Sequence, residues 1–151
     1  GEVEKDMNKN YKEMLDKYLP QKTIWTEEKD NEFYIKGQDI LEVLGFLKEQ
    51  GFNFLADISA VDYREYFEVV YQLCSYNDDR HLVLKIRLDY HNPQVQSIFS
   101  LWKTADWLER EVYDLMGIKF INHPHLERIL TWEGFEGHPL RKDFISQGGR
   151  E

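Results

Sequence analysis

The stretch Tyr66–Asp89, YFEVVYQLCSYNDDRHLVLKIRLD, decides the fold of this chain. Strict alternation of apolar with other residues predicts half-buried β-strands, so each half of the stretch is expected to form one. The polar run Asn77–Arg80 separates the halves and predicts a turn, which makes them an antiparallel hairpin. The side chains expected on the buried face are Phe67, Val69, Tyr71, Leu73, Leu82, Leu84, Ile86 and Leu88.

The flanking sequence adds helices and shorter strands. Apolar residues at helical spacing predict three amphipathic helices, and glycine or proline marks the end of each. The first helix runs from Met7 to Leu19, and the second is capped by Asp39 and stops at Gly51. The third follows Ser97 or Ser100 and ends at Gly117. The further strands expected are Ile24–Trp25, Phe33–Ile35 and Phe52–Tyr63.

This order of elements predicts an α+β fold, with helices on one face of an antiparallel or mixed sheet. We expect a single domain whose body spans residues 1–117. Residues 118–151 are rich in apolar side chains but follow neither the helical nor the strand period, and Pro124, Gly134, Gly137 and Pro139 interrupt them. They are therefore predicted to form an extended, irregular docking arm that lies on a partner surface.

The composition excludes several classes of function. A net charge of −9 argues against nucleic-acid binding, because the chain would not neutralise a phosphate backbone. No run approaches the roughly 20 apolar residues that span a bilayer, and the acidic start Gly1–Asp6 does not resemble a signal peptide. Cys74 is the one cysteine, so the chain alone cannot form a disulfide or supply four thiolates to an iron–sulfur cluster. These features favour a reducing, cytoplasmic setting.

The histidines suggest one enzymatic alternative, a small metal-dependent hydrolase. His123, His125 and His138 could supply imidazole ligands, with a carboxylate from Glu127 or Asp143. However, the proline between the first two histidines favours an extended backbone, in which their side chains point to opposite sides. Structural, hydrogen-bonding histidines are the favoured interpretation.

The third helix carries the charged residues Glu109, Arg110, Glu111 and Asp114. A solvated face with an Arg110–Asp114 pair is the favoured interpretation, and buried ion pairing where two subunits meet is the alternative. No serine lies in a nucleophile elbow, and no glycine-rich loop precedes a helix. The residues themselves thus indicate a scaffold or interaction subunit rather than an independent enzyme.

Several strings together resemble a known family. They are Glu109–Phe120 (EREVYDLMGIKF), His123–Leu130 (HPHLERIL) and Gly137–Phe144 (GHPLRKDF), with weaker likeness at Ala60–Tyr63 and Phe67–Tyr71. The first string is similar to the signature ERExxDxxGIxF. In these strings the chain resembles the 30-kDa subunit family of respiratory complex I, known in bacteria as the C subunit of NADH-quinone oxidoreductase.

The resemblance implies a non-catalytic, cofactor-free, peripheral-arm subunit of an NADH:quinone oxidoreductase that couples electron transfer to ion translocation. It implies docking on the subunit related to the hydrogenase large subunit, next to iron–sulfur subunits. The complex would lie at the cytoplasmic side of the plasma membrane, and this chain would contact the membrane only through it. The partner-binding residues implied are Glu109, Arg110, Glu111, Asp114, His123, Arg128, His138, Arg141, Lys142 and Asp143.

Two positions depart from the family pattern. His125 stands where the family usually has aspartate, and Glu127 stands where a basic residue is common. Related subunits also occur in group 4 membrane-bound nickel–iron hydrogenases and in deazaflavin-dependent dehydrogenases. The electron donor of the complex is therefore left open by the sequence.

Overall fold

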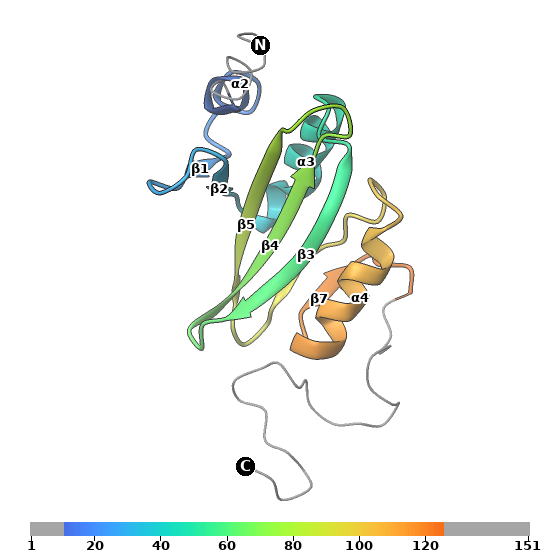
Figure 1. Cartoon of the computed structure of the whole chain (residues 1–151). Coiled ribbons are helices and arrows are strands. Elements are labelled where there is room, and N and C mark those ends of the chain that lie inside the picture. Colours follow the sequence, from blue (N-terminus) through green and yellow to red (C-terminus); the bar gives the residue numbers. More distant parts are fainter. Residues whose placement is uncertain (1–10, 126–151) are drawn as a thin grey trace, which may run out of the picture.

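The computed structural model describes residues 11–125 and is built around one five-stranded sheet (Figure 1). The strand order is β1-β2-β5-β4-β3. A short parallel pair, β6 and β7, lies outside this sheet. The strands are β1 Ile24–Trp25, β2 Glu32–Tyr34, β3 Phe54–Asp62, β4 Tyr66–Cys74, β5 His81–Asp89, β6 Gln94–Gln96 and β7 Lys119–Ile121.

The predicted hairpin is confirmed as the centre of the sheet. β4 and β5 pair antiparallel with Tyr71 opposite Leu84, and β3 pairs antiparallel on the other side of β4. β2 adds parallel to β5, with Phe33 opposite Leu84, so the sheet is mixed. The alternating apolar residues of β4 and β5 share one face, and all are buried.

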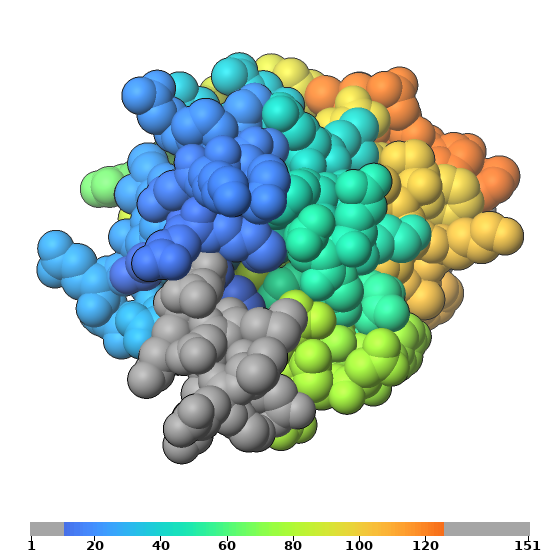
Figure 2. Space-filling model, turned by 90° about the horizontal axis from the view of Figure 1, so that it is seen from above, coloured from blue at the N-terminus to red at the C-terminus, as the bar shows by residue number. Residues whose placement is uncertain are grey.

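Within residues 11–125, three α-helices accompany the sheet: α2 Tyr11–Tyr18, α3 Ile40–Glu49 and α4 Ala105–Met116. A 3₁₀ turn, η1 Gly37–Asp39, leads into α3. Figure 1 shows α3 behind the long strands and α4 beside β3, and Figure 2 shows α3 between α2 and the α4 region. The α+β fold with a mixed sheet is as predicted.

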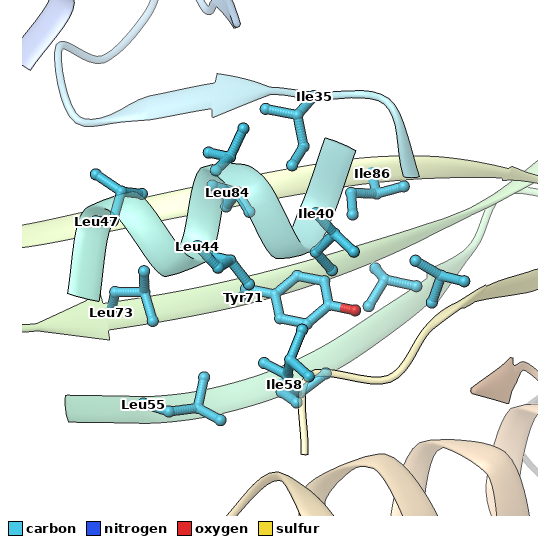
Figure 3. Close-up of a cluster of buried hydrophobic side chains, with 14 of the residues drawn as sticks. Ile35, Ile40, Leu44, Leu47, Leu55, Ile58, Tyr71, Leu73, Leu84 and Ile86 are labelled. Atoms are coloured by element: carbon cyan, nitrogen blue, oxygen red, sulfur yellow. The ribbon is translucent and has the colours of Figure 1, made fainter. Parts of the chain in front are cut away.

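The core lies between the sheet and α3. Ile40, Leu44 and Leu47 repeat at helical spacing and are fully buried against the β-strands, where Tyr71 and Leu84 face them (Figure 3). Full burial of one such aliphatic side chain contributes roughly 1.5–3 kcal/mol to stability. Gly51 ends the α3 segment with φ +104°, in agreement with its predicted role as a stop.

The cap predicted at Asp39 differs in detail. The Asp39 side chain makes no capping hydrogen bond to α3. Its carboxylate instead lies 3.3 Å from the Lys22 ammonium, which also contacts Glu42. The chain enters the helix through the 3₁₀ turn, and a long-range ion pair takes the place of the cap.

The regular structure extends beyond the predicted body boundary at residue 117. β7 pairs with β6, and Ile118 and Phe120 are buried in the main core. A strand of three residues is too short for alternation to be recognised in the sequence, which is why this pair was not predicted. The larger part of the predicted arm, residues 126–151, lies outside the described residues, so its extended form stays a prediction.

Candidate docking site at helix α4

Helix α4 begins later than predicted, and its start is linked to the site. Residues 98–104 form turns, and the helix starts at Ala105. Ser97 does not open a helix: its hydroxyl accepts a hydrogen bond from the Phe99 N–H (3.1 Å) and donates one to Glu109 (2.5 Å). At the other end Gly117 has φ +77° and its N–H donates to the Tyr113 carbonyl, which is the predicted left-handed stop.

Glu109 is completely buried at the centre of the site. One carboxylate oxygen accepts the Ser97 hydroxyl and the other accepts the Ile98 N–H at 2.9 Å. Burial raises the pKa of Glu109 to about 7, the two hydrogen bonds act to lower it, and the nearby Asp106 raises it further. The side chain thus ties α4 to the segment that follows β6, and it titrates near neutral pH.

His123 links the end of β7 to the same cluster, and its side chain is fully buried. Its Nδ1 accepts the His125 backbone N–H at 2.9 Å, so the proton of the neutral ring is on Nε2. Nε2 lies 3.2 Å from the Asp106 carbonyl, 3.2 Å from the Asp106 carboxylate and 3.9 Å from Glu109. Burial lowers the pKa of His123, which favours this neutral form.

Tyr71 closes the cluster on the core side. Its ring is fully buried among the strands and α3, and its hydroxyl has no hydrogen-bond partner among residues 11–125. Burial raises the pKa of Tyr71 well above 10, and the nearby Glu109 carboxylate raises it further. Tyr71 therefore stays protonated beside Glu109.

The favoured interpretation of a solvated charged face on α4 is wrong for two residues. Glu109 and Asp114 are fully buried, because these positions face the core rather than the solvent. Arg110 is only 17% exposed in its side chain and lies 3.7 Å from the Asp106 carboxylate. The exposed part of the helix is instead marked by Trp107, which is 54% accessible.

The structure brings together some of the predicted site residues and adds others. Glu109, Arg110 and His123 gather along the N-terminal half of α4, and Ser97 and Asp106 join them although neither was predicted. Asp106 stands three residues before Glu109, a spacing that places both on one side of a helix and could have indicated it. The predicted residues outside the described part of the chain are Arg128, His138, Arg141, Lys142 and Asp143.

The geometry does not favour a metal centre. Within residues 11–125 no group of three potential ligands is close enough to hold a metal ion. Both ring nitrogens of His123 are engaged in the contacts described above, so neither offers a lone pair.

None of the described helices is long and apolar enough to cross a membrane.

The cluster has a structural role. The Glu109 carboxylate, the neutral His123 ring and the Ser97 hydroxyl all make contacts with one another or with backbone groups, whereas the Tyr71 hydroxyl has no partner among residues 11–125. These hydrogen bonds fix the positions of the segments that they join. The fold and the site together define an α+β module in which buried polar contacts hold the residues directly after β7 against α4.

Comparison with known proteins gives the family. A sequence model described as "Respiratory-chain NADH dehydrogenase, 30 Kd subunit" matches residues 33–150. The chain belongs to this family.

The relatives have related names and cover most of the chain. The C subunit of NADH-quinone oxidoreductase from Moorella thermoacetica is 47% identical over 116 residues, covering 75% of this chain and 78% of the relative. The corresponding protein of a Roseiflexus species is 48% identical over 120 residues, with 76% and 69% covered. A mitochondrial 30.4-kDa subunit of NADH-ubiquinone oxidoreductase from Neurospora crassa is 42% identical and aligns with 91% of this chain but only 50% of itself.

Solved structures agree with the fold. A trypsin-resistant fragment of Nqo5 superposes with a TM-score of 0.64 at 29% identity, covering 76% of this chain and 98% of the fragment. A chain of the membrane-bound sulfane sulfur reductase, an archaeal respiratory membrane complex, superposes with a TM-score of 0.78 over 98% of this chain and 88% of that one. At 24% identity, the second likeness is one of fold alone.

Proposed function

We propose that this chain is a cofactor-free subunit of an ion-translocating NADH:quinone oxidoreductase. It supplies protein contacts to the complex, and the redox groups reside in other subunits. It lies on the cytoplasmic side of the plasma membrane and reaches the membrane only through the complex. The names and identities of its relatives support the type of complex.

The proposed docking surface consists of α4 and the chain that follows His123. The observation that carries this proposal is a pair of buried contacts on α4. Glu109 accepts hydrogen bonds from Ser97 and Ile98, and His123 Nε2 lies 3.2 Å from the Asp106 carbonyl, which holds the residues directly after β7 against α4. A partner that binds the residues after His123 meets a segment whose first residues are already held against α4. Less conformational entropy is therefore lost on binding.

The proposed partner is the subunit related to the hydrogenase large subunit, with iron–sulfur subunits next to it. The contacts assigned to the partner are those of Glu111 and of the basic and acidic residues in the last part of the chain, Arg128, His138, Arg141, Lys142 and Asp143. Arg141, Lys142 and Asp143 present both signs of charge over three residues, which suits pairing with charges of both signs on the partner.

Deletion of the gene tests this function. Membranes from the deletion strain should lose quinone-dependent NADH oxidation, and the wild-type chain supplied in trans should restore it. Unchanged activity in the deletion strain would contradict the proposal.

The same membranes distinguish the alternative complexes. Loss of hydrogen evolution or of reduced-deazaflavin oxidation, with NADH oxidation unaffected, would assign the chain to a group 4 nickel–iron hydrogenase or to a deazaflavin-dependent dehydrogenase. The genes next to this one, encoding an NADH-binding, nickel–iron or deazaflavin-binding subunit, give an independent answer.

A further inference from the structure

A groove lies at the β1–β2 edge of the sheet, at a distance in the fold from α4. Its volume is about 490 Å³, and the residues that define its character are Ile24, Trp25, Tyr34, Lys36 and Arg87. This volume is in the range of binding pockets in proteins. Neither the polar cluster of α4 nor the proposed docking surface uses it.

The walls of the groove are aromatic and held in place. The Trp25 ring packs on the buried Phe33 ring at 4.8 Å between centroids. The Arg87 guanidinium lies 4.8 Å from the ring centres of both Tyr34 and Tyr66, so the two tyrosines hold it between them. Tyrosine, tryptophan and arginine held rigidly are the residue types that carry most of the binding energy at protein interfaces.

The groove is cationic in a chain whose net charge is −9. Among residues 11–125, its lining contains the cations Lys22, Lys36 and Arg87 and one carboxylate, that of Asp39. Asp39 and the neighbouring Glu42 both contact Lys22, which is thereby matched. Lys36 and Arg87, the second of which also lies in a 3.8 Å ion pair with Glu68, are the two cations available to a ligand.

Lys36 and Arg87 are accessible. Within residues 11–125 no ion pair engages Lys36, which is exposed. Arg87 is 56% exposed in its side chain, and its Nε is 3.8 Å from Glu68, longer than a hydrogen bond. A guanidinium whose plane is fixed is suited to bind a carboxylate through two parallel hydrogen bonds.

We propose that this groove binds an acidic segment of a neighbouring subunit, with a carboxylate on Arg87 and Lys36 and an apolar side chain against Trp25 and Tyr34. Ile24, which is 68% exposed at the rim, adds apolar surface to the contact. The inference rests on the proposed role as a subunit of a complex, and it adds a second contact on a different side of the molecule. The contact weakens as ionic strength rises, because its charged groups are partly exposed.

The test is site-specific crosslinking in the assembled complex. The photoreactive residue p-benzoylphenylalanine is placed at position 24 of the full-length chain, and at Tyr76 as a control. Tyr76 is 69% exposed at the β4–β5 turn and does not line the groove. After co-expression with the other subunits and irradiation, mass spectrometry identifies the adducts. We expect position 24, and not position 76, to yield an adduct with an Asp- or Glu-rich segment of another subunit.

Charge reversal gives the second arm. Lys36→Glu should weaken association with the complex lacking this chain roughly tenfold at low salt, whereas Lys17→Glu, with the same change in charge on exposed α2, should have little effect. Lys36 is exposed, so the variant should fold like the wild type.

The outcomes separate the two proposals. If the wild-type chain assembles but position 24 forms no adduct, or one with a second copy or with its own sequence, the groove does not contact another subunit and only this inference fails. Equal effects of Lys36→Glu and Lys17→Glu would overturn it as well. If the wild-type chain does not assemble at all, the proposed function fails.

Discussion

At the scale of single residues, Glu109 is the side chain that ties α4 to the segment after β6. The sequence pattern places it on a charged helix face, yet it is buried with two hydrogen bonds from Ser97 and Ile98. Burial costs the ionised form more than the hydrogen bonds return, which is why its pKa is raised to about 7. The charge of this buried carboxyl group therefore changes near neutral pH.

This response predicts a pH dependence of stability. The Glu109 carboxyl has a pKa near 4.5 when unfolded and about 7 when folded, so the folded state binds more protons between these values. The free energy of unfolding of the wild type should therefore fall as pH rises from 4.5 through 7, by on the order of 3 kcal/mol. In Glu109→Gln this contribution should be absent, because the amide does not titrate.

Urea denaturation of both proteins at pH 5 and pH 8 measures the effect. His123 acts in the opposite direction. Its pKa is lower in the folded protein than the value near 6.5 of the unfolded chain, so its contribution to the free energy of unfolding rises as pH increases toward 6.5. Because both proteins retain His123, the difference between their two pH profiles isolates Glu109. Parallel profiles would show that Glu109 is not the titrating group.

His123 gives a second prediction at this scale. His123→Ala leaves the His125 N–H without its acceptor and removes a fully buried ring, so the free energy of unfolding should fall by roughly 1–3 kcal/mol or more. Thermal denaturation of the purified variant measures the loss.

The same variant tests the metal-dependent alternative. The wild-type protein should contain no stoichiometric zinc by elemental analysis, and His123→Ala should leave metal content unchanged. Zinc at one equivalent in the wild type, lost in the variant, would instead revive a hydrolase based on His123, His125 and His138.

At the scale of elements, the C-terminal end of α4 depends on a left-handed residue. Gly117 has φ +77°, where a Cβ atom is unfavourable, so Gly117→Ala should destabilise the protein by about 1 kcal/mol. Gly45→Ala is the matched control: Gly45 lies within α3, and a Cβ there meets only Leu101 at an ordinary 3.8 Å. It should be neutral or stabilising by up to about 1 kcal/mol. Chemical denaturation compares the two; a larger loss in Gly45→Ala would contradict this explanation of the α4 end.

The segment that follows β7 is expected to act in assembly. Arg141→Ala should weaken association with the other subunits while the melting temperature of the isolated chain changes by less than about 2 °C. Arg80→Ala serves as a comparison, because Arg80 contacts Asp78 and lies over Phe52 in the described body, so its loss should lower the melting temperature. A collapse of stability in Arg141→Ala would mean that this residue packs on its own body.

How well the sequence predicts these elements depends on their length and on what they contact. The β4–β5 hairpin and α3 could be predicted because their local periods match the faces that they bury. The parallel pairing of β2 with β5 could not, since it joins segments about fifty residues apart and no local pattern encodes it. Burial of Glu109 was missed because its partners, the Ser97 hydroxyl and the Ile98 N–H, lie in a turn that the sequence suggested was the start of a helix.

At the scale of the whole molecule, we propose a module with two contact regions whose redox groups are supplied by the rest of the complex. The polar cluster at α4 holds the residues directly after β7, and the groove at the β1–β2 edge lies elsewhere on the sheet. Purified chain alone is expected to show no NADH oxidation and no visible absorption band. A chromophore that copurifies with the isolated chain would contradict the proposal that it is cofactor-free.

The measurement that tests the central claim most directly is copurification with the subunit related to the hydrogenase large subunit. An affinity tag is placed on that partner, the two chains are co-expressed, and the eluate is analysed by native mass spectrometry. We predict a one-to-one assembly that is retained in Glu109→Gln and weakened in Arg141→Ala. A wild-type chain that remains a free monomer in the presence of the folded, tagged partner would contradict the claim.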